Sequence, residues 1–237
     1  DGLGLFTWIN GKKYEGQFRN GKRHGQGTFT YSEKSKYTGQ WKDGKKDGLG
    51  SMFREDGSEY HGCYGVSSEA LKEYHLNRIR ILDHSNADFF AFETIPSFQE
   101  AKVLAELLEE TEKTAWISFS CKDGNHLNDG TDITECVSFF ANNPKIFAIG
   151  VNCTAPKYIS GLIKSIKAKS GSKKIIVYPN SGEAYNAESK TWVGLSDPVL
   201  FVTMVKEWIE LGADILGGCC RIGPDHIKSI RDILPNN

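Results

Sequence analysis

"IFAIGVNC", residues 146–153, is an almost unbroken run of apolar residues that ends in Asn and Cys. A strand with one face in water alternates apolar and polar residues, whereas a strand covered on both faces is apolar nearly throughout. The run therefore predicts a buried strand of a parallel sheet with helices packed on it.

The same texture continues on both sides of this run, where short apolar segments alternate with amphipathic patterns. Further strands are expected at 88–96, 116–120, 175–182 and 214–220. Helices are expected at 67–82, from the Ser97–Glu100 capping box onward, around 132–141, over 158–169, from Pro198 and from Pro224. This alternation predicts an α/β fold of the barrel type, in which functional side chains lie at the carboxyl ends of strands.

Three cysteines stand at such strand ends. Cys153 ends the first strand described above, and Cys219 and Cys220 end the last. Three converging thiolates can hold a Zn²⁺ ion and leave its fourth position open. Neighbouring strand residues point to opposite faces, so both vicinal cysteines can ligate only where the backbone bends, and Gly217 and Gly218 supply that freedom. The alternative is that each is a small buried residue, which fits an isolated cysteine better than this set.

The remaining cysteines and the overall composition carry less information. Cys121 also follows a strand, whereas Cys63 and Cys136 are expected to fill core or surface. Scattered thiols and the lack of a signal peptide favour a reducing, cytoplasmic setting. No apolar run approaches the ~20 residues of a membrane helix. A net charge of −1 gives no reason to expect a nucleic-acid partner.

The first 64 residues carry a different pattern, an internal repeat with a period of 23 residues. The recurring positions are Tyr14, Tyr37 and Tyr60; Gly16, Gly39 and Gly62; Phe18, Trp41 and Tyr64; Gly21 and Gly44; Gly25 and Gly48; Gly27 and Gly50. Aromatic residues on one face, with "NGK" and "DGK" turns, predict a stack of short β-hairpins that are stable only together. The unit "YEGQFRNGKRHGQGTFTY" resembles the MORN repeat. That resemblance implies a binding or scaffolding module whose partner is a membrane surface or a protein.

The repeat stops after residue 64, because Ser67 and Leu71 stand where glycine should recur. We therefore predict two domains, a MORN-repeat module at 1–64 and an α/β domain at 65–237. The stretch "EDGSEYHGCYG" at 55–65 keeps the repeat and also begins the second domain, so the seam is expected there.

Four segments of the second domain resemble the homocysteine S-methyltransferase family, most closely its cobalamin-independent branch. They are "ADFFAFETIP", "AIGVNCTAP", "IIVYPNSGEAYN" and "GADILGGCCRIGPDHI". The resemblance implies a zinc-dependent enzyme that moves a methyl group from a sulfonium donor to the thiol of homocysteine, giving methionine. The implied donor is S-methylmethionine or S-adenosylmethionine.

The same resemblance implies a role for individual residues. It makes Cys153, Cys219 and Cys220 the zinc ligands. Glu93 matches the carboxylate that holds the homocysteine ammonium group. Asn152, Asn180 and Ser181 would line the substrate pocket.

The family's fold is a (β/α)8 barrel, and the predicted strands correspond to its strands 4–8. A partial barrel has two open sheet edges, which predicts self-association through them. Three interpretations remain open at this point. The chain is an enzyme whose barrel is completed elsewhere, an inactive scaffold that binds through its repeats, or a truncated or chimeric gene product.

Overall fold

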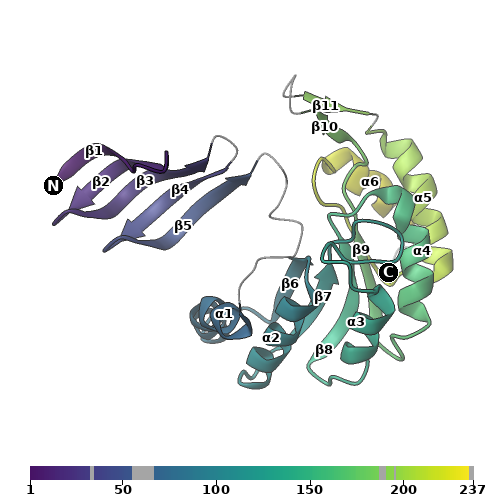
Figure 1. The fold of residues 1–237 in the computed structure, drawn as a ribbon. Helices are drawn as coiled ribbons and strands as arrows, with labels where there is room; N and C mark the ends of the chain where they lie inside the picture. Colours follow the sequence, from purple (N-terminus) through teal and green to yellow (C-terminus); the bar gives the residue numbers. More distant parts are fainter. Residues whose placement is uncertain (33–34, 55–66, 187–190, 195, 235–237) are drawn as a thin grey trace. The chain divides into compact units, whose positions relative to one another are not determined.

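The computed structural model describes residues 1–237 apart from 33–34, 55–66, 187–190, 195 and 235–237. Two compact units make up the chain, Asp1–Glu59 and Tyr60–Asn237 (Figure 1). The seam predicted at 55–65, which includes Cys63, lies outside the described residues. The position of the domain boundary therefore stays a prediction.

The first unit is a single antiparallel sheet in which each strand pairs with the next along the chain. Its strands are β1 Gly2–Thr7, β2 Lys13–Arg19, β3 Lys22–Ser32, β4 Ser35–Lys42 and β5 Lys45–Arg54. The two glycine positions of the repeat lie opposite each other on neighbouring strands, since Gly16 faces Gly27 and Gly27 faces Gly39. Tyr14, Phe29, Tyr37 and Trp41 form its buried cluster. The predicted hairpins thus form one continuous sheet, and the partner of this sheet stays a prediction.

The second unit contains a parallel sheet in the order β12-β9-β8-β7-β6 (Figure 1). The strands are β6 Phe89–Ile95, β7 Thr114–Phe119, β8 Ile146–Asn152, β9 Lys174–Tyr178 and β12 Ile215–Leu216. The helices are α1 Ser68–Asp83, α2 Phe98–Glu109, α3 Ile133–Phe140, α4 Pro156–Lys167, α5 Pro198–Leu211 and α6 Pro224–Ile233. The predicted partial barrel of five βα units is confirmed.

The connection from β9 to α5 differs from expectation. A small antiparallel pair lies there, made of β10 Ala184–Asn186 and β11 Thr191–Val193. The strand β12 is also shorter than the 214–220 predicted. Its backbone nevertheless continues beside β9, because the amides of Gly217 and Cys219 donate to the carbonyls of Val177 and Pro179 at 3.0 and 2.8 Å.

Most helix starts in this unit follow local capping signals. Ser67, Ser97, Asp132 and Asp197 precede helices, and their side-chain oxygens accept hydrogen bonds from amides of the first turn. Ser97 accepts from the Glu100 amide, as the predicted capping box requires.

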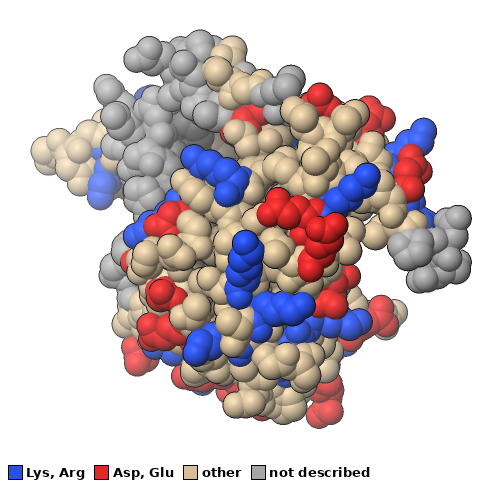
Figure 2. Space-filling model, turned by 90° about the vertical axis from the view of Figure 1, so that its right-hand side faces the viewer, with Lys and Arg blue, Asp and Glu red and all other residues tan. Residues whose placement is uncertain are grey.

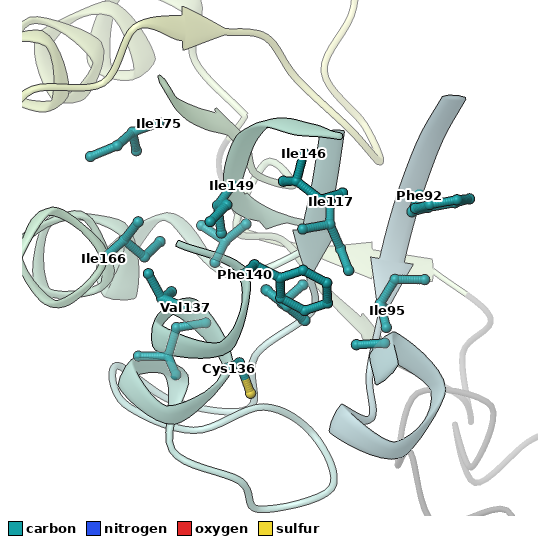
Figure 3. Close-up of a cluster of buried hydrophobic side chains, with 14 of the residues drawn as sticks. Phe92, Ile95, Ile117, Cys136, Val137, Phe140, Ile146, Ile149, Ile166 and Ile175 are labelled. Carbon is teal, nitrogen blue, oxygen red and sulfur yellow. The ribbon is translucent and has the colours of Figure 1, made fainter. Parts of the chain in front are cut away.

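The core lies between one face of the parallel sheet and the helices. Figure 3 shows Ile117 of β7 and Ile149 of β8 packed with Val137 and Phe140 of α3, and all four side chains are buried. Side chains alternate along a strand, so the strand neighbours of Ile117 and Ile149 point to the opposite face of the sheet, which we call the inner face. That inner face carries the candidate site.

The strands β6 and β12 form the two edges of the parallel sheet. Among the described residues no strand pairs with the outer edge of β6. A groove of ≈ 550 Å³ lies there, lined in part by Tyr74 and Ile79 of α1. Self-association through these edges stays a prediction.

Charged residues are distributed without a dominant sign on the face seen in Figure 2, where Lys and Arg alternate with Asp and Glu. That nucleic acid is not a partner stays a prediction. None of the helices in the described parts of the chain combines the length and the apolarity needed to cross a bilayer. The cytoplasmic location stays a prediction.

Candidate metal centre and substrate pocket

The three cysteines predicted as metal ligands come together beyond the carboxyl ends of β8 and β12. The Sγ atom of Cys220 lies 3.7 Å from that of Cys153 and 4.0 Å from that of Cys219. All three sulfurs lie within 4.8 Å of one another. Cys153 and Cys219 are half-buried and Cys220 is exposed, so the group is accessible from solvent.

The spacing of the sulfurs fits a single tetrahedral ion. Zn–S bonds of about 2.3 Å at tetrahedral angles place two sulfurs about 3.8 Å apart. The two sulfur–sulfur distances, 3.7 and 4.0 Å, bracket that value. Three protein ligands are also the number found in catalytic zinc sites, where water or substrate takes the fourth position. The described residues therefore contain a group able to hold a metal ion.

The backbone beside the cysteines is bent in a way that lets the sulfurs meet. Cys153 has φ 46° and Arg221, directly after Cys220, has φ 67°. Few residues other than glycine adopt this left-handed region. Neither Gly217 nor Gly218 has a positive φ. The predicted bend therefore lies after the vicinal pair and not at the glycines before it.

Gly218 has a packing role instead. A Cβ atom at this position would lie only 2.1 Å from Cγ2 of Ile222. Since real Cβ contacts are never so close, only glycine lets the chain fold back on itself here. The two residues flank the cysteine turn, so this close contact helps to fix its path.

Protonation of the cysteine group is set by its surroundings. Burial raises the pKa of the Cys153 thiol, and the hydrogen-bonded Cys219 thiol raises it further. Burial also raises the pKa of Cys220, and the charge of Cys219 adds to that effect. A cation beside the sulfurs favours thiolates and reverses both shifts. Metal binding at this group is therefore coupled to loss of protons.

The loop after β9 lies directly beside the cysteine turn. The Ser181 amide donates to the Cys220 carbonyl at 3.0 Å, and the Asn180 amide donates to the Thr154 carbonyl at 3.2 Å. The Ser181 hydroxyl donates to Oε2 of Glu183 at 2.9 Å. The structure thus brings Asn180 and Ser181 against the backbone of Thr154 and Cys220, beside the cysteine group. Their contact with a substrate stays a prediction.

An ion pair ties the same loop to the residue after the cysteines. The Arg221 guanidinium donates twice to Glu183, from Nε to Oε2 at 3.0 Å and from Nη2 to Oε1 at 3.1 Å. The Glu183 side chain is 7% exposed. Sequence reasoning missed both residues. The only local signal was an acidic residue in the "NSGE" loop and a basic residue after "CC".

Glu93 and Asn152 lie on neighbouring parts of the sheet but in different environments. Glu93 is exposed near the end of β6, whereas Asn152 is 1% exposed at the end of β8. The Asn152 side chain is hydrogen-bonded to Thr94 and Ser118. A substrate contact by Asn152 stays a prediction, as does the ammonium-binding role of Glu93.

Tyr178 joins this group, and sequence reasoning missed it. Its hydroxyl is hydrogen-bonded to the hydroxyl of Ser118. Burial raises the pKa of Tyr178, and the negative charge of Glu93 raises it as well. Tyr178 therefore stays protonated, with its hydroxyl close to the Glu93 carboxylate. Its register opposite Asn152 follows from the pairing of β8 with β9.

Two other cysteines in the described part of the chain do not belong to the sulfur group. Cys121 and Cys136 are buried, and each belongs to the core of the second unit. Burial raises the pKa of both thiols. They are packing residues, as expected for Cys136.

The chain is similar to known proteins in its family pattern, its sequence and its fold. A family model described as homocysteine S-methyltransferase matches residues 39–234, and a MORN repeat model matches residues 14–36. Homocysteine S-methyltransferase 2 of Arabidopsis thaliana is 46% identical over 182 residues, which cover 74% of this chain and 54% of that protein. Homocysteine S-methyltransferase YbgG of Bacillus subtilis is 47% identical over 170 residues, which cover 71% of this chain and 54% of that protein.

A solved structure agrees with these matches. The metallated form of the homocysteine methyltransferase MmuM from Escherichia coli superimposes with a TM-score of 0.63 at 33% identity. The superposition covers 75% of this chain and 56% of that one. The chain thus spans about half the length of the relatives it matches. Both resemblances drawn from the sequence are confirmed.

Proposed function

The chain belongs to the homocysteine S-methyltransferase family, and on that premise we propose that it transfers a methyl group from a sulfonium donor to homocysteine. The products are methionine and a neutral thioether, and the donor is S-methylmethionine or S-adenosylmethionine. The observation that carries the proposal is the group of three sulfurs, 3.7 and 4.0 Å apart, at the carboxyl edge of the sheet.

Cys153, Cys219 and Cys220 would hold the zinc ion. When bound there, zinc supplies a positive charge that favours the thiolate form of a substrate thiol near neutral pH. A free thiol with a pKa near 8.5 would otherwise be mostly protonated. The Glu183–Arg221 pair and the Ser181 amide support the cysteine turn from the neighbouring loop.

Glu93 would bind the ammonium group of homocysteine. Its carboxylate is exposed on the inner face of the sheet, near the Tyr178 hydroxyl. Asn180 and Ser181 would form the wall of the pocket beside the sulfurs. Holding the amino acid at its ammonium end and its thiol end fixes the direction from which the sulfur attacks the methyl carbon.

The reaction itself asks little acid–base chemistry of the protein. The homocysteine sulfur donates an electron pair to the methyl carbon, and the bond to the sulfonium sulfur breaks with its pair. The leaving group is therefore an uncharged thioether that needs no proton. The described residues need only remove water, orient both reactants and keep the nucleophile deprotonated.

Two measurements on the full chain test the proposal. Zinc content is expected to approach one ion per chain, and Cys219→Ser should remove most of it, while the buried Cys136→Ser should leave it unchanged. The zinc-loaded chain should then form methionine from homocysteine and either sulfonium donor. A folded chain that takes up no zinc contradicts the metal site. A zinc-loaded chain without turnover contradicts the enzyme and favours a binding protein.

A further inference from the structure

Thr94, the residue after Glu93, has a backbone conformation that a threonine rarely adopts. Its φ is 59°, and a β-branched residue in this left-handed region is strained. The pairing of β6 with β7 is interrupted at the same place, with a register shift between Phe92 and Ile95. Such bulges re-aim side chains and are common beside active sites. Something in the surrounding structure must hold Thr94 in place.

The Asn152 side chain provides that restraint. Its Oδ1 atom accepts from the Thr94 amide at 2.8 Å, and its Nδ2 atom donates to the Thr94 hydroxyl at 2.7 Å. Oδ1 also accepts from the Ser118 hydroxyl at 3.0 Å. Asn152 and Ser118 are 1% and 0% exposed. The Asn152 side chain on β8, two strands away, therefore supplies hydrogen bonds to Thr94 in place of the strand pairing that the bulge interrupts in β6.

Asn152 also connects this restraint to the cysteine group. It is the last residue of β8 and stands directly before Cys153. The Cys153 amide donates to the Tyr178 carbonyl at 3.3 Å, which fixes the end of β8 against β9. One buried side chain thus links the strand that presents Glu93 to the strand that presents the first sulfur.

We propose that Asn152 is a positioning residue that fixes the Glu93 carboxylate relative to the three sulfurs and does not contact the substrate. This inference rests on the proposed function, because it concerns how homocysteine is held at its two ends. Its consequence is selectivity for an amino acid over a simple thiol. Losing Asn152 lets Thr94 relax, and Glu93 then no longer meets the ammonium group.

The test compares two ligands by calorimetry on the zinc-loaded full chain. The ligands are homocysteine and its desamino analogue, which has the same thiol and carboxylate but no ammonium group. Asn152→Ala should weaken homocysteine binding about tenfold, the scale of one charge-assisted hydrogen bond, and leave the analogue nearly unaffected. Equal weakening of both ligands, or loss of zinc, would mean that Asn152 contacts the ligand or merely supports the fold.

A second substitution separates positioning from contact. Glycine adopts a positive φ without strain, so Thr94→Gly needs no restraint from Asn152. The Asn152→Ala/Thr94→Gly double variant should therefore bind homocysteine more tightly than Asn152→Ala alone. If the double variant instead binds homocysteine more weakly than Asn152→Ala, by the added loss from Thr94→Gly, the proposal is overturned. If Asn152→Ala does not fold, Thr94→Val, which removes the hydroxyl but keeps the shape, should weaken homocysteine more than the analogue.

Amide hydrogen exchange keeps this test separate from that of the function. Exchange of the Thr94 amide should be much faster in Asn152→Ala than in the unaltered chain, while amides of the β8 core keep their protection. If the unaltered chain binds neither ligand, the proposed function fails, and the exchange result still decides whether Asn152 restrains Thr94. Unchanged exchange at Thr94 would contradict the inference whatever the chain binds.

Discussion

Glu183 and Arg221 stand 38 positions apart in the chain and form a two-pronged ion pair, with N–O distances of 3.0 and 3.1 Å. The pair joins the loop after β9 to the residue that follows Cys220. Arg221 has a positive φ, and paired planar groups fix orientation as well as distance. The ion pair therefore helps to determine where the Cys219 and Cys220 sulfurs lie, although neither Glu183 nor Arg221 belongs to the sulfur cluster.

Removing the charge of Glu183 should weaken metal binding. Glu183→Gln keeps the size of the side chain but loses the ion pair, so the cysteine turn becomes less ordered before the ion binds. Loss of groups that support metal ligands typically costs roughly 10- to 100-fold in affinity. We expect a loss at the lower end of that range, measured by zinc competition with a chelating dye.

A surface ion pair elsewhere serves as the control. Lys72 and Glu106 join α1 to α2 at 3.7 Å, and both side chains are well exposed. Glu106→Gln should leave zinc affinity unchanged, because exposed pairs contribute little. Equal affinities for Glu183→Gln and the unaltered chain would show that the cysteine turn is rigid without its ion pair.

The same pair predicts a dependence on pH in the metal-free protein. The hydrogen bond from Arg221 lowers the pKa of Glu183, and that from Ser181 lowers it further. A carboxylate whose pKa is lower in the folded state stabilises the fold fully above its unfolded pKa, about 4.3. That stabilisation is lost as pH falls through the lower, folded value.

Thermal unfolding of the unaltered chain and Glu183→Gln across pH checks this prediction. The difference between their melting temperatures should be constant above about pH 5 and should shrink below about pH 4, since only the unaltered chain titrates at this position. A difference that stays constant down to pH 3 would contradict the assignment.

The strand and helix order of the second unit could be predicted because its signals are local. Apolar runs mark the buried strands, and Ser97 marks the start of α2. The meeting of Cys153 with Cys219 and Cys220 could also be predicted, because parallel strands end at one edge of the sheet. Each of these inferences needed only the sequence of the elements concerned and the general rules of the fold.

The features that sequence reasoning missed all depend on contacts between distant segments. Arg221 is an ordinary basic loop residue until Glu183 is placed beside it. Thr94 reads as a strand residue, and its positive φ is sustained by Asn152, 58 positions away. Asn152 was predicted as a pocket residue, but its hydrogen bonds to Thr94 and Ser118 of two other strands could not be read from the sequence. Local patterns contain none of this information.

Adjacent phenylalanines of α3 allow a matched test of the core. Phe140 is fully buried and contacts Phe119, whereas Phe139 is 48% exposed. Phe140→Ala should destabilise the second unit by about 3–5 kcal/mol, because it removes apolar contacts and leaves a cavity. Phe139→Ala should cost less than about 1 kcal/mol. Urea unfolding of the full chain, followed by far-UV circular dichroism, measures both; equal effects would mean that the core relaxes to fill the space.

Two repeated glycines of the first unit should respond differently to substitution, because they serve different purposes. Gly27 lies against the Tyr14 ring, where a Cβ atom would meet the hydroxyl at 2.1 Å. Gly21 has open space around it but a φ of 69°. Gly27→Ala should therefore displace Tyr14, which is fully buried, and disrupt the β2–β3 pairing. Gly21→Asn should cost only a few tenths of a kcal/mol, since asparagine tolerates a positive φ.

Amide hydrogen exchange in β2 and β3 of the full chain distinguishes the two substitutions. Protection should fall throughout both strands in Gly27→Ala and stay near that of the unaltered chain in Gly21→Asn. A Tyr14→Phe/Gly27→Ala double variant should recover little of the protection, because the ring carbons Cζ and Cε2 would still lie 2.4 and 2.6 Å from the added Cβ atom. If Gly27→Ala leaves protection unchanged, the glycine period does not reflect close packing against the tyrosines. The repeat would then be explained by turn geometry alone, of the kind seen at Gly21 and Gly44.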